Sequence, residues 1–216
     1  MNEALPVLYG AGYSVYVRAV LMALSAKGAR FVHEPVDVFA EGGAPSSYLA
    51  LSPFGKIPTL KHGDLVLYET IAINRYIDEA FEGPSLQPAN VKSRARMMQL
   101  MSMTDSYGYW PLVWEVYVER ISKPREGLTS DEAKIANGLS RARIFLGAVE
   151  TNMVGGPWLL GSQTSLADFQ LAPVIGYFIQ APEGADLLAE FQNLSAWWKT
   201  VESNAMWKAA IAASNE

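Results

Sequence analysis

The chain of 216 residues contains no cysteine. This absence excludes disulfide bonds, zinc sites built on thiolates, and catalysis by a cysteine nucleophile. Histidine is also rare: the chain contains only His33 and His62. Neither has a cysteine or helical carboxylate nearby in the sequence. We therefore expect no metal site.

Long hydrophobic runs and clusters of basic charge are missing as well. No apolar segment approaches the ~18 residues of a membrane span. The start, MNEALPVLYG, lacks the basic segment of a secretory signal. Lysine and arginine number 17 against 22 acidic residues, which gives a net charge of −5 and no basic cluster. We expect a cytoplasmic protein whose partners include neither membranes nor nucleic acid.

Hydrophobic residues make up 50% of the chain, enough for a substantial core. The N-terminal part mixes strand and helix signals. In order, these are a strand at 5–10, a helix from Tyr16 to Gly28, a strand within 30–38, two strands within 56–68 joined at His62-Gly63-Asp64, and a helix over 70–81. A βαβ half followed by a ββα half that shares its sheet predicts a thioredoxin-like layout.

The stretch EGPSLQPAN interrupts this pattern and is typical of a linker. Beyond it only helical periodicity appears, in five segments: 91–121, 130–153, 166–178, 185–202 and 204–213. The predicted fold class is therefore α/β plus all-α. We expect a thioredoxin-like domain over 1–82, a linker over 83–92 and an all-helical domain over 93–216.

Four motifs occur in a characteristic order: LYGAGYSVYVRAVLMAL, SPFGKIPTL, LYETIAINRYI and TSLADFQLAPVI. Together they resemble the cytosolic glutathione transferase family over essentially the whole chain. The first motif is most similar to classes with a catalytic serine after the first strand, including the zeta class. It departs from the zeta class at Ser14-Val15-Tyr16, where that class has Ser-Ser-Cys.

The resemblance implies an enzyme of detoxification that uses glutathione as its cosubstrate and needs no metal. The glutathione thiolate would attack an electrophilic carbon of a small apolar substrate. A zeta-like isomerase or dehalogenase and a non-catalytic binding or protein-interaction module are the alternatives. The resemblance also implies a homodimer, with residues 71–103 supplying much of the interface.

Ser14 is the candidate catalytic residue. It precedes a helix whose N-terminus would favour a thiolate, and its hydroxyl could donate to the sulfur. Tyr13 and Tyr16 are rivals for this role, since tyrosine activates the thiol in other classes of the family. The simpler interpretation is that Ser14 only caps the helix.

Pro58 stands inside a strand-like run, where it cannot donate to a sheet. By resemblance its peptide bond is cis, and the bend presents the backbone of Ile57 to the cysteinyl part of glutathione. Lys56 is a candidate for the glycyl carboxylate. A trans proline that opens an edge strand is the alternative.

Glu69 and Thr70 lie where a strand passes into a helix, a favourable place for a carboxylate. The resemblance assigns both residues to the γ-glutamyl end of glutathione. Thr70 as an ordinary N-cap is the alternative, and the two roles are compatible.

Two further assignments concern the helical part. Ser165-Leu166-Ala167-Asp168 has the spacing of a capping box, so we interpret Asp168 as structural. The family's electrophile pocket implies five aromatic candidates: Tyr13, Tyr16, Tyr107, Trp110 and Trp114. On residue type alone, the three in the helical part are more typical of helix core.

Overall fold

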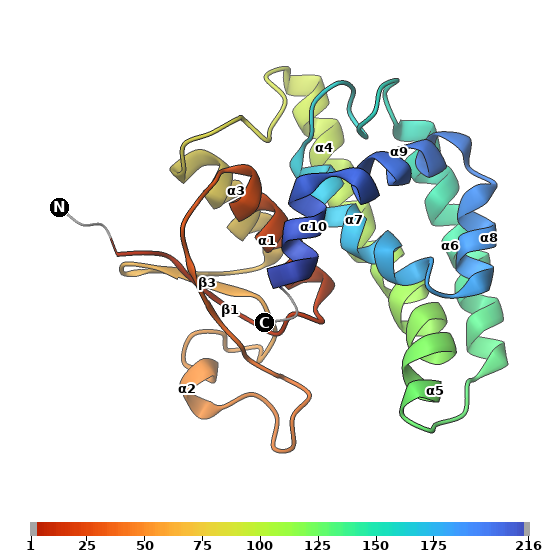
Figure 1. Ribbon diagram of the computed structural model, residues 1–216, viewed down its shortest axis with the longest axis horizontal. Coiled ribbons are helices and arrows are strands. Elements are labelled where there is room, and N and C mark those ends of the chain that lie inside the picture. Colours follow the sequence, from red (N-terminus) through yellow and green to blue (C-terminus); the bar gives the residue numbers. More distant parts are fainter. Residues whose placement is uncertain (1–3, 214–216) are drawn as a thin grey trace. The chain divides into compact units, whose positions relative to one another are not determined.

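A four-stranded sheet organises the N-terminal part of the computed structural model, which describes residues 4–213 (Figure 1). The strands are β1 (Val7–Tyr9), β2 (Val32–Glu34), β3 (Thr59–His62) and β4 (Leu65–Tyr68), in the order β2-β1-β3-β4. β1 runs parallel to β2 and antiparallel to β3, and β3 is antiparallel to β4. The predicted thioredoxin-like layout is confirmed.

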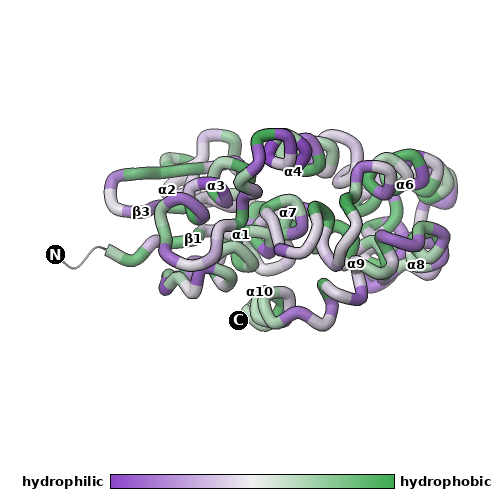
Figure 2. The backbone as a smooth tube through the Cα atoms, turned by 90° about the horizontal axis from the view of Figure 1, so that it is seen from above, coloured by the Kyte–Doolittle hydropathy of each residue, from purple (hydrophilic) through white to green (hydrophobic). Residues whose placement is uncertain are grey.

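Helices α1 (Val15–Ala26), α2 (Ser46–Leu49) and α3 (Thr70–Ala80) accompany this sheet in the first of two structural units. α1 packs against α3, which in turn contacts β3 and β4. Hydrophobic residues dominate α1 in Figure 2, and eight of its 12 residues are buried. The short α2 was not predicted, because four residues in a segment rich in proline and glycine show no helical period.

The C-terminal helix α10 (Ala205–Ala213) packs on α1 and so belongs to this first unit. Among the described residues, the unit comprises 4–86 and 204–213, and the second unit is Gln87–Ser203. This division differs from the expected helical domain over 93–216. Helical periodicity identifies a buried face but does not say which neighbour covers it.

A buried ion pair ties the end of α1 to the end of α3. Lys27 Nζ lies 3.1 Å from Asp78 Oδ1, with both side chains at most 4% exposed. Lys27 also donates to the Pro84 carbonyl, and Asp78 accepts from the Leu86 N–H. The first residues of the expected linker over 83–92 are therefore held within the first unit.

The second unit is helical. Its elements are α4 (Val91–Met103), η1 (Thr104–Gly108), η2 (Trp110–Ser122), α5 (Lys123–Arg125), α6 (Glu132–Asn152), α7 (Leu166–Phe178), α8 (Pro182–Ala189) and α9 (Gln192–Ser203). The segments η1 and η2 continue α4 with wider π-helical turns. The helix expected over 185–202 is two helices, α8 and α9. Among residues 4–213, no helix is both long and apolar enough to cross a membrane.

Asp168 anchors the start of α7, as the capping-box spacing predicts. Its carboxylate is fully buried and accepts hydrogen bonds from the Ser165 N–H and hydroxyl, the Leu159 N–H and Trp197 Nε1. Burial raises the pKa of Asp168, and the four donors oppose that rise. These bonds join α7, the loop before it and α9, which gives Asp168 a structural role.

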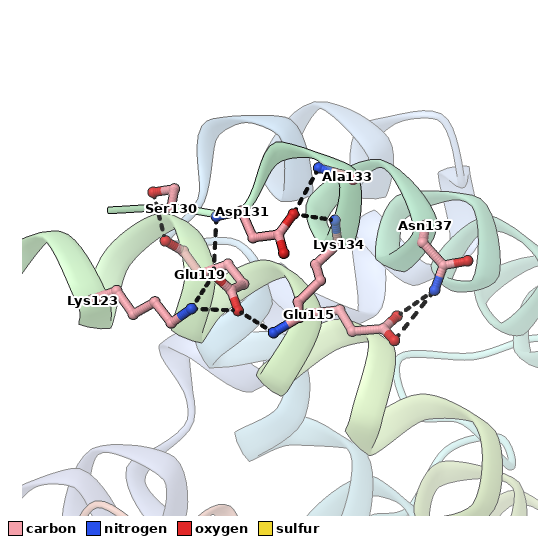
Figure 3. A network of polar contacts seen from close by, with 8 residues as sticks. All are labelled: Glu115, Glu119, Lys123, Ser130, Asp131, Ala133, Lys134 and Asn137. Atoms are coloured by element: carbon pink, nitrogen blue, oxygen red, sulfur yellow. Dashed lines mark hydrogen bonds and ion pairs between the residues drawn. The ribbon is translucent and has the colours of Figure 1, made fainter. Parts of the chain in front are cut away.

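A second buried carboxylate, Glu119, joins the end of η2 to the start of α6 (Figure 3). Its side chain is 3% exposed and pairs with Lys123 at 2.7 Å and Lys134 at 3.2 Å. It also accepts from the Asp131 N–H, while its carbonyl accepts from the Ser130 hydroxyl. Burial alone would raise the pKa of Glu119, but these hydrogen bonds outweigh burial and lower it.

Because the folded pKa of Glu119 is lowered, its contribution to stability is fully present above the pKa of an unfolded glutamate, about 4.3. The contribution is lost as pH falls through the lower, folded pKa. We expect Glu119→Gln to lower the free energy of unfolding by roughly 1–2 kcal/mol at pH 7, since both lysines are partly exposed. Urea titrations at pH 7 and at the acidic limit of folding measure both values.

The matched control is Glu190→Gln in the same unit, where Glu190 pairs with Arg143 and both side chains are more than half exposed. We expect a much smaller change there, because surface ion pairs contribute little. Equal losses for the two variants, or a Glu119→Gln loss that does not shrink toward acid pH, would contradict the assigned role.

Candidate active site

The first three sequence motifs meet at one end of the sheet. Tyr9 in β1 pairs with Thr59 in β3, and Thr59 pairs with Tyr68 in β4. This row precedes the loop to Ser14, follows Pro58 and precedes Glu69. The strand register therefore brings together segments that are far apart in the sequence.

Gly10 makes this convergence possible. A Cβ at this position would lie 2.5 Å from Val17 Cγ2 and 3.2 Å from Ile57 Cβ, and the residue has φ +150°. A larger side chain would push α1 and the Ile57 segment away from the end of β1.

Ser14 is the N-cap of α1 and is half-buried. Its Oγ accepts a long hydrogen bond, 3.4 Å, from the Val17 N–H. A hydroxyl that accepts still has its proton to donate, and within residues 4–213 that proton has no acceptor. Capping and donation to a thiolate are thus compatible at Ser14.

Tyr13 has its hydroxyl proton engaged. It donates to Asp37 Oδ1 at 2.6 Å, and Asp37 also accepts from the Phe39 N–H. Burial and the neighbouring carboxylate raise the pKa of Tyr13 well above its ordinary value. Tyr16 lies half-buried in the first turn of α1.

Arg18 is a cation near Ser14 that the sequence motifs did not indicate as a site residue. It lies one helical turn after Ser14, and its Nε donates to the Gly12 carbonyl at 2.8 Å. The i, i+4 spacing from Ser14 was visible in the sequence, since residues four apart share a helix face.

At the second motif, the Ile57–Pro58 peptide bond is cis. Ile57 is half-buried, Pro58 is buried and Lys56 is exposed. Across the part of the chain that the structure describes, the N–H and C=O of Ile57 make no hydrogen bond. One donor and one acceptor are therefore available at this end of the sheet.

At the third motif, Glu69 is the exposed N-cap of α3, without a side-chain capping bond, and Thr70 is the buried first residue of the helix. The interpretation of Thr70 as N-cap is wrong by one residue. Glu69 has φ 72° and ψ 111°, and no other non-glycine residue among 4–213 has positive φ. Such conformations cost of order 1–3 kcal/mol and cluster at functional sites.

The aromatic candidates of the helical unit are partly exposed. Tyr107 is 65% and Trp110 54% exposed, so neither is helix core. Trp110 stacks on Trp114, whose Nε1 donates to the Tyr109 hydroxyl at 2.9 Å. Tyr107 borders a cavity of about 260 Å³ between the η1 region and α6, within this unit.

The two histidines have separate partners. His33 Nε2 lies 2.8 Å from the Gly10 carbonyl, and His62 Nδ1 lies 2.7 Å from the Tyr76 hydroxyl. Among the described residues, no group of three or more histidine and acidic side chains is arranged to hold a metal ion.

Comparison with known proteins agrees with this fold and identifies the family. Residues 8–85 match the profile of the glutathione S-transferase N-terminal domain, and residues 109–205 match that of the C-terminal domain. Glutathione S-transferase F10 of Arabidopsis thaliana is 30% identical over 203 residues, which cover 93% of this chain and 94% of that protein. The chain therefore belongs to the glutathione S-transferase family.

Solved structures give the same result. Apo glutathione S-transferase III superposes with a TM-score of 0.85 at 30% identity, over 99% of this chain and 98% of that one. A theta-class glutathione S-transferase of Xanthomonas axonopodis pv. citri, solved with glutathione bound, has a TM-score of 0.81 at 25% identity. That match covers 95% of this chain and 96% of the other.

The backbone of Glu69 allows a test of its strain. We expect Glu69→Gly to be more stable than Glu69→Ala by about 1 kcal/mol, because glycine adopts positive φ without the cost that alanine retains. At the helical, exposed Glu79 the order should reverse, since glycine is the poorer helix former. Chemical denaturation of the four variants measures the order, and the same order at both positions would contradict the strain.

Proposed function

We propose that this chain conjugates glutathione to small electrophilic substrates. The thiolate sulfur forms a bond to an electrophilic carbon, and a leaving group departs or an activated double bond takes up a proton. The observation that carries the proposal is the Ser14 hydroxyl, which caps α1 yet keeps its proton for a thiolate. All the chemistry can proceed without cysteine, because the nucleophile belongs to the cosubstrate.

The energetics suit a thiol at this position. A free thiol has a pKa near 8.5, so only a few per cent is thiolate at pH 7. Each unit of depression requires ~1.36 kcal/mol of preference for the charged form. A hydrogen bond to a charged group contributes about 1.5–3 kcal/mol, and the N-terminus of α1 adds a favourable field.

The proposed glutathione subsites follow the three motifs. The backbone of Ile57, next to Pro58, pairs with the cysteinyl residue as an added strand would. Glu69 takes the γ-glutamyl ammonium, and Thr70 with the N-terminus of α3 takes its carboxylate. Lys56 takes the glycyl carboxylate, and the exposure of its side chain supports this role.

The electrophile is the small hydrophobic partner. The proposed residues for its pocket are Tyr13, Tyr16, Tyr107, Trp110 and Trp114. The exposure of Tyr107 and Trp110 supports a role in contact with something other than the helix core. Cytoplasmic location and a role in detoxification complete the proposal.

The central test is the pKa of bound glutathione, read from thiolate absorbance. We expect Ser14→Ala to raise that pKa by one to two units and to lower turnover at pH 7 about ten- to a hundredfold. Tyr13→Phe should leave the pKa within a few tenths of a unit, because the Tyr13 proton is engaged by Asp37. Tyr16→Phe serves as the second tyrosine control.

A raised pKa in a tyrosine variant, with Ser14→Ala unchanged, would transfer the catalytic role to that tyrosine. A bound thiol without any depression in the wild type would favour the non-catalytic module. Isomerisation or dehalogenation without stable conjugates in a substrate screen would favour the zeta-like alternative.

Glutathione affinity tests the γ-glutamyl subsite separately. We expect Glu69→Ala and Thr70→Ala each to weaken glutathione binding about ten- to a hundredfold, the effect of losing one charged hydrogen bond. Titration calorimetry measures the change. Affinities within twofold of the wild type for both variants would place the γ-glutamyl subsite elsewhere.

We further propose a homodimer in which residues 71–103 supply much of the interface. Supporting it, Val91, Ala95 and Met98 lie at i, i+4 and i+7 on α4 and are all exposed. A charge within such a stripe would oppose association, so Met98→Glu should produce monomers at micromolar concentration while the wild type sediments as a dimer. Val154→Glu, at an exposed apolar residue outside this region, is the control and should stay dimeric.

A further inference from the structure

A cluster of buried hydroxyl groups lies beside the Ile57 segment. Tyr48 of α2, Ser52 and Thr59 are each at most 3% exposed. The Tyr48 hydroxyl donates to the Lys56 carbonyl at 2.6 Å, and the Ser52 hydroxyl donates to the same oxygen at 3.1 Å. Two donors on one carbonyl satisfy both of its lone pairs.

The direction of the chain of hydrogen bonds follows from proton counting. Tyr48 Oη lies 2.9 Å from Thr59 Oγ1, and either oxygen could donate. A phenol has a single proton, and Tyr48 gives it to Lys56, so Thr59 must be the donor to Tyr48. Burial also raises the pKa of Tyr48, which keeps that proton in place. Tyr48 thus spans the segment on both sides, from Lys56 to Thr59.

The Lys56 carbonyl and the Ile57 N–H belong to one planar peptide unit. This peptide is trans, since the Ile57–Pro58 bond is the single cis bond found within residues 4–213. In a trans peptide the C=O and N–H point in opposite directions. A carbonyl directed at Tyr48 and Ser52 therefore directs the Ile57 N–H away from the buried cluster, where it has no partner in the described chain.

We propose that Tyr48 is a positioning residue for glutathione, acting through the Lys56–Ile57 peptide on the cysteinyl carbonyl of the ligand. This inference rests on the Ile57 subsite of the proposed function. Hydrogen bonds accepted by the carbonyl hold the peptide plane and polarise it, which makes the Ile57 N–H a better donor. Without the Tyr48 hydroxyl, the plane keeps only the longer bond from Ser52.

The test combines a protein variant with a ligand variant. Tyr48→Phe removes the hydroxyl and keeps the ring. The ligand variant is a glutathione analogue in which a trans double bond replaces the cysteinyl–glycyl amide, so it lacks the cysteinyl carbonyl. We expect Tyr48→Phe to raise the Kd of glutathione about three- to tenfold, the effect of one neutral hydrogen bond, and the Kd of the analogue by less than twofold.

Steady-state kinetics should show the same selectivity. The KM for glutathione should rise in Tyr48→Phe by about the factor seen in Kd, while the KM for the electrophile stays unchanged. Tyr9→Phe is the matched control, because the Tyr9 ring lies 6.3 Å from the Tyr48 ring and its hydroxyl makes no hydrogen bond in the described part of the chain. Its Kd should stay within twofold of the wild type.

Three results would overturn the inference: a glutathione Kd within twofold of the wild type in Tyr48→Phe, equal losses for glutathione and the analogue, or an equal loss in Tyr9→Phe. If Tyr48→Phe does not fold, Ser52→Ala applies the same test, with a smaller rise for glutathione alone. If the wild type binds the analogue as tightly as glutathione, the Ile57 subsite is wrong and this inference falls with it. Thiol activation by Ser14 is measured separately and is not affected by that result.

Discussion

Unpaired backbone groups at one end of the sheet are the constraint on which this site depends. A helix cannot satisfy its first N–H groups, and a bend that ends a strand leaves its own donor and acceptor open. The register that aligns Tyr9, Thr59 and Tyr68 places three such openings together, at the start of α1, at Ile57 and at the start of α3. The ligand proposed above, a peptide with two carboxylates and a thiolate, would complement all three.

Much of this could be read from the sequence, because the relevant signals are local. Gly28 ends α1, His62-Gly63-Asp64 joins β3 to β4, and Pro58 marks a place where a strand cannot continue. The features that could not be predicted from the sequence depend on tertiary context. Nothing local says that α10 packs on α1, or that Glu69 rather than Thr70 is the cap with positive φ.

The same distinction separates the residues proposed to contact glutathione from the residue proposed to position them. Ser14 and Glu69 lie within sequence motifs that indicate them as candidate site residues. Tyr48 does not, since a tyrosine in a short irregular segment is most simply interpreted as core. Its role becomes visible only when the hydroxyl is seen between Lys56 and Thr59, on either side of the exposed peptide.

The polar groups that stabilise the helical unit differ from those of the candidate site, because their hydrogen bonds are satisfied within the chain. Asp168 and Glu119 are buried carboxylates whose oxygens accept hydrogen bonds from backbone and side-chain donors. These hydrogen bonds offset the free-energy cost of burying the charge, and they order the helix junctions. In the first unit, by contrast, the proposed function uses groups that have no partner in the described chain. The Ser14 hydroxyl proton and the Ile57 N–H have no partner among the described residues, so the proposed thiolate peptide could take up both donors without breaking a hydrogen bond of the folded chain.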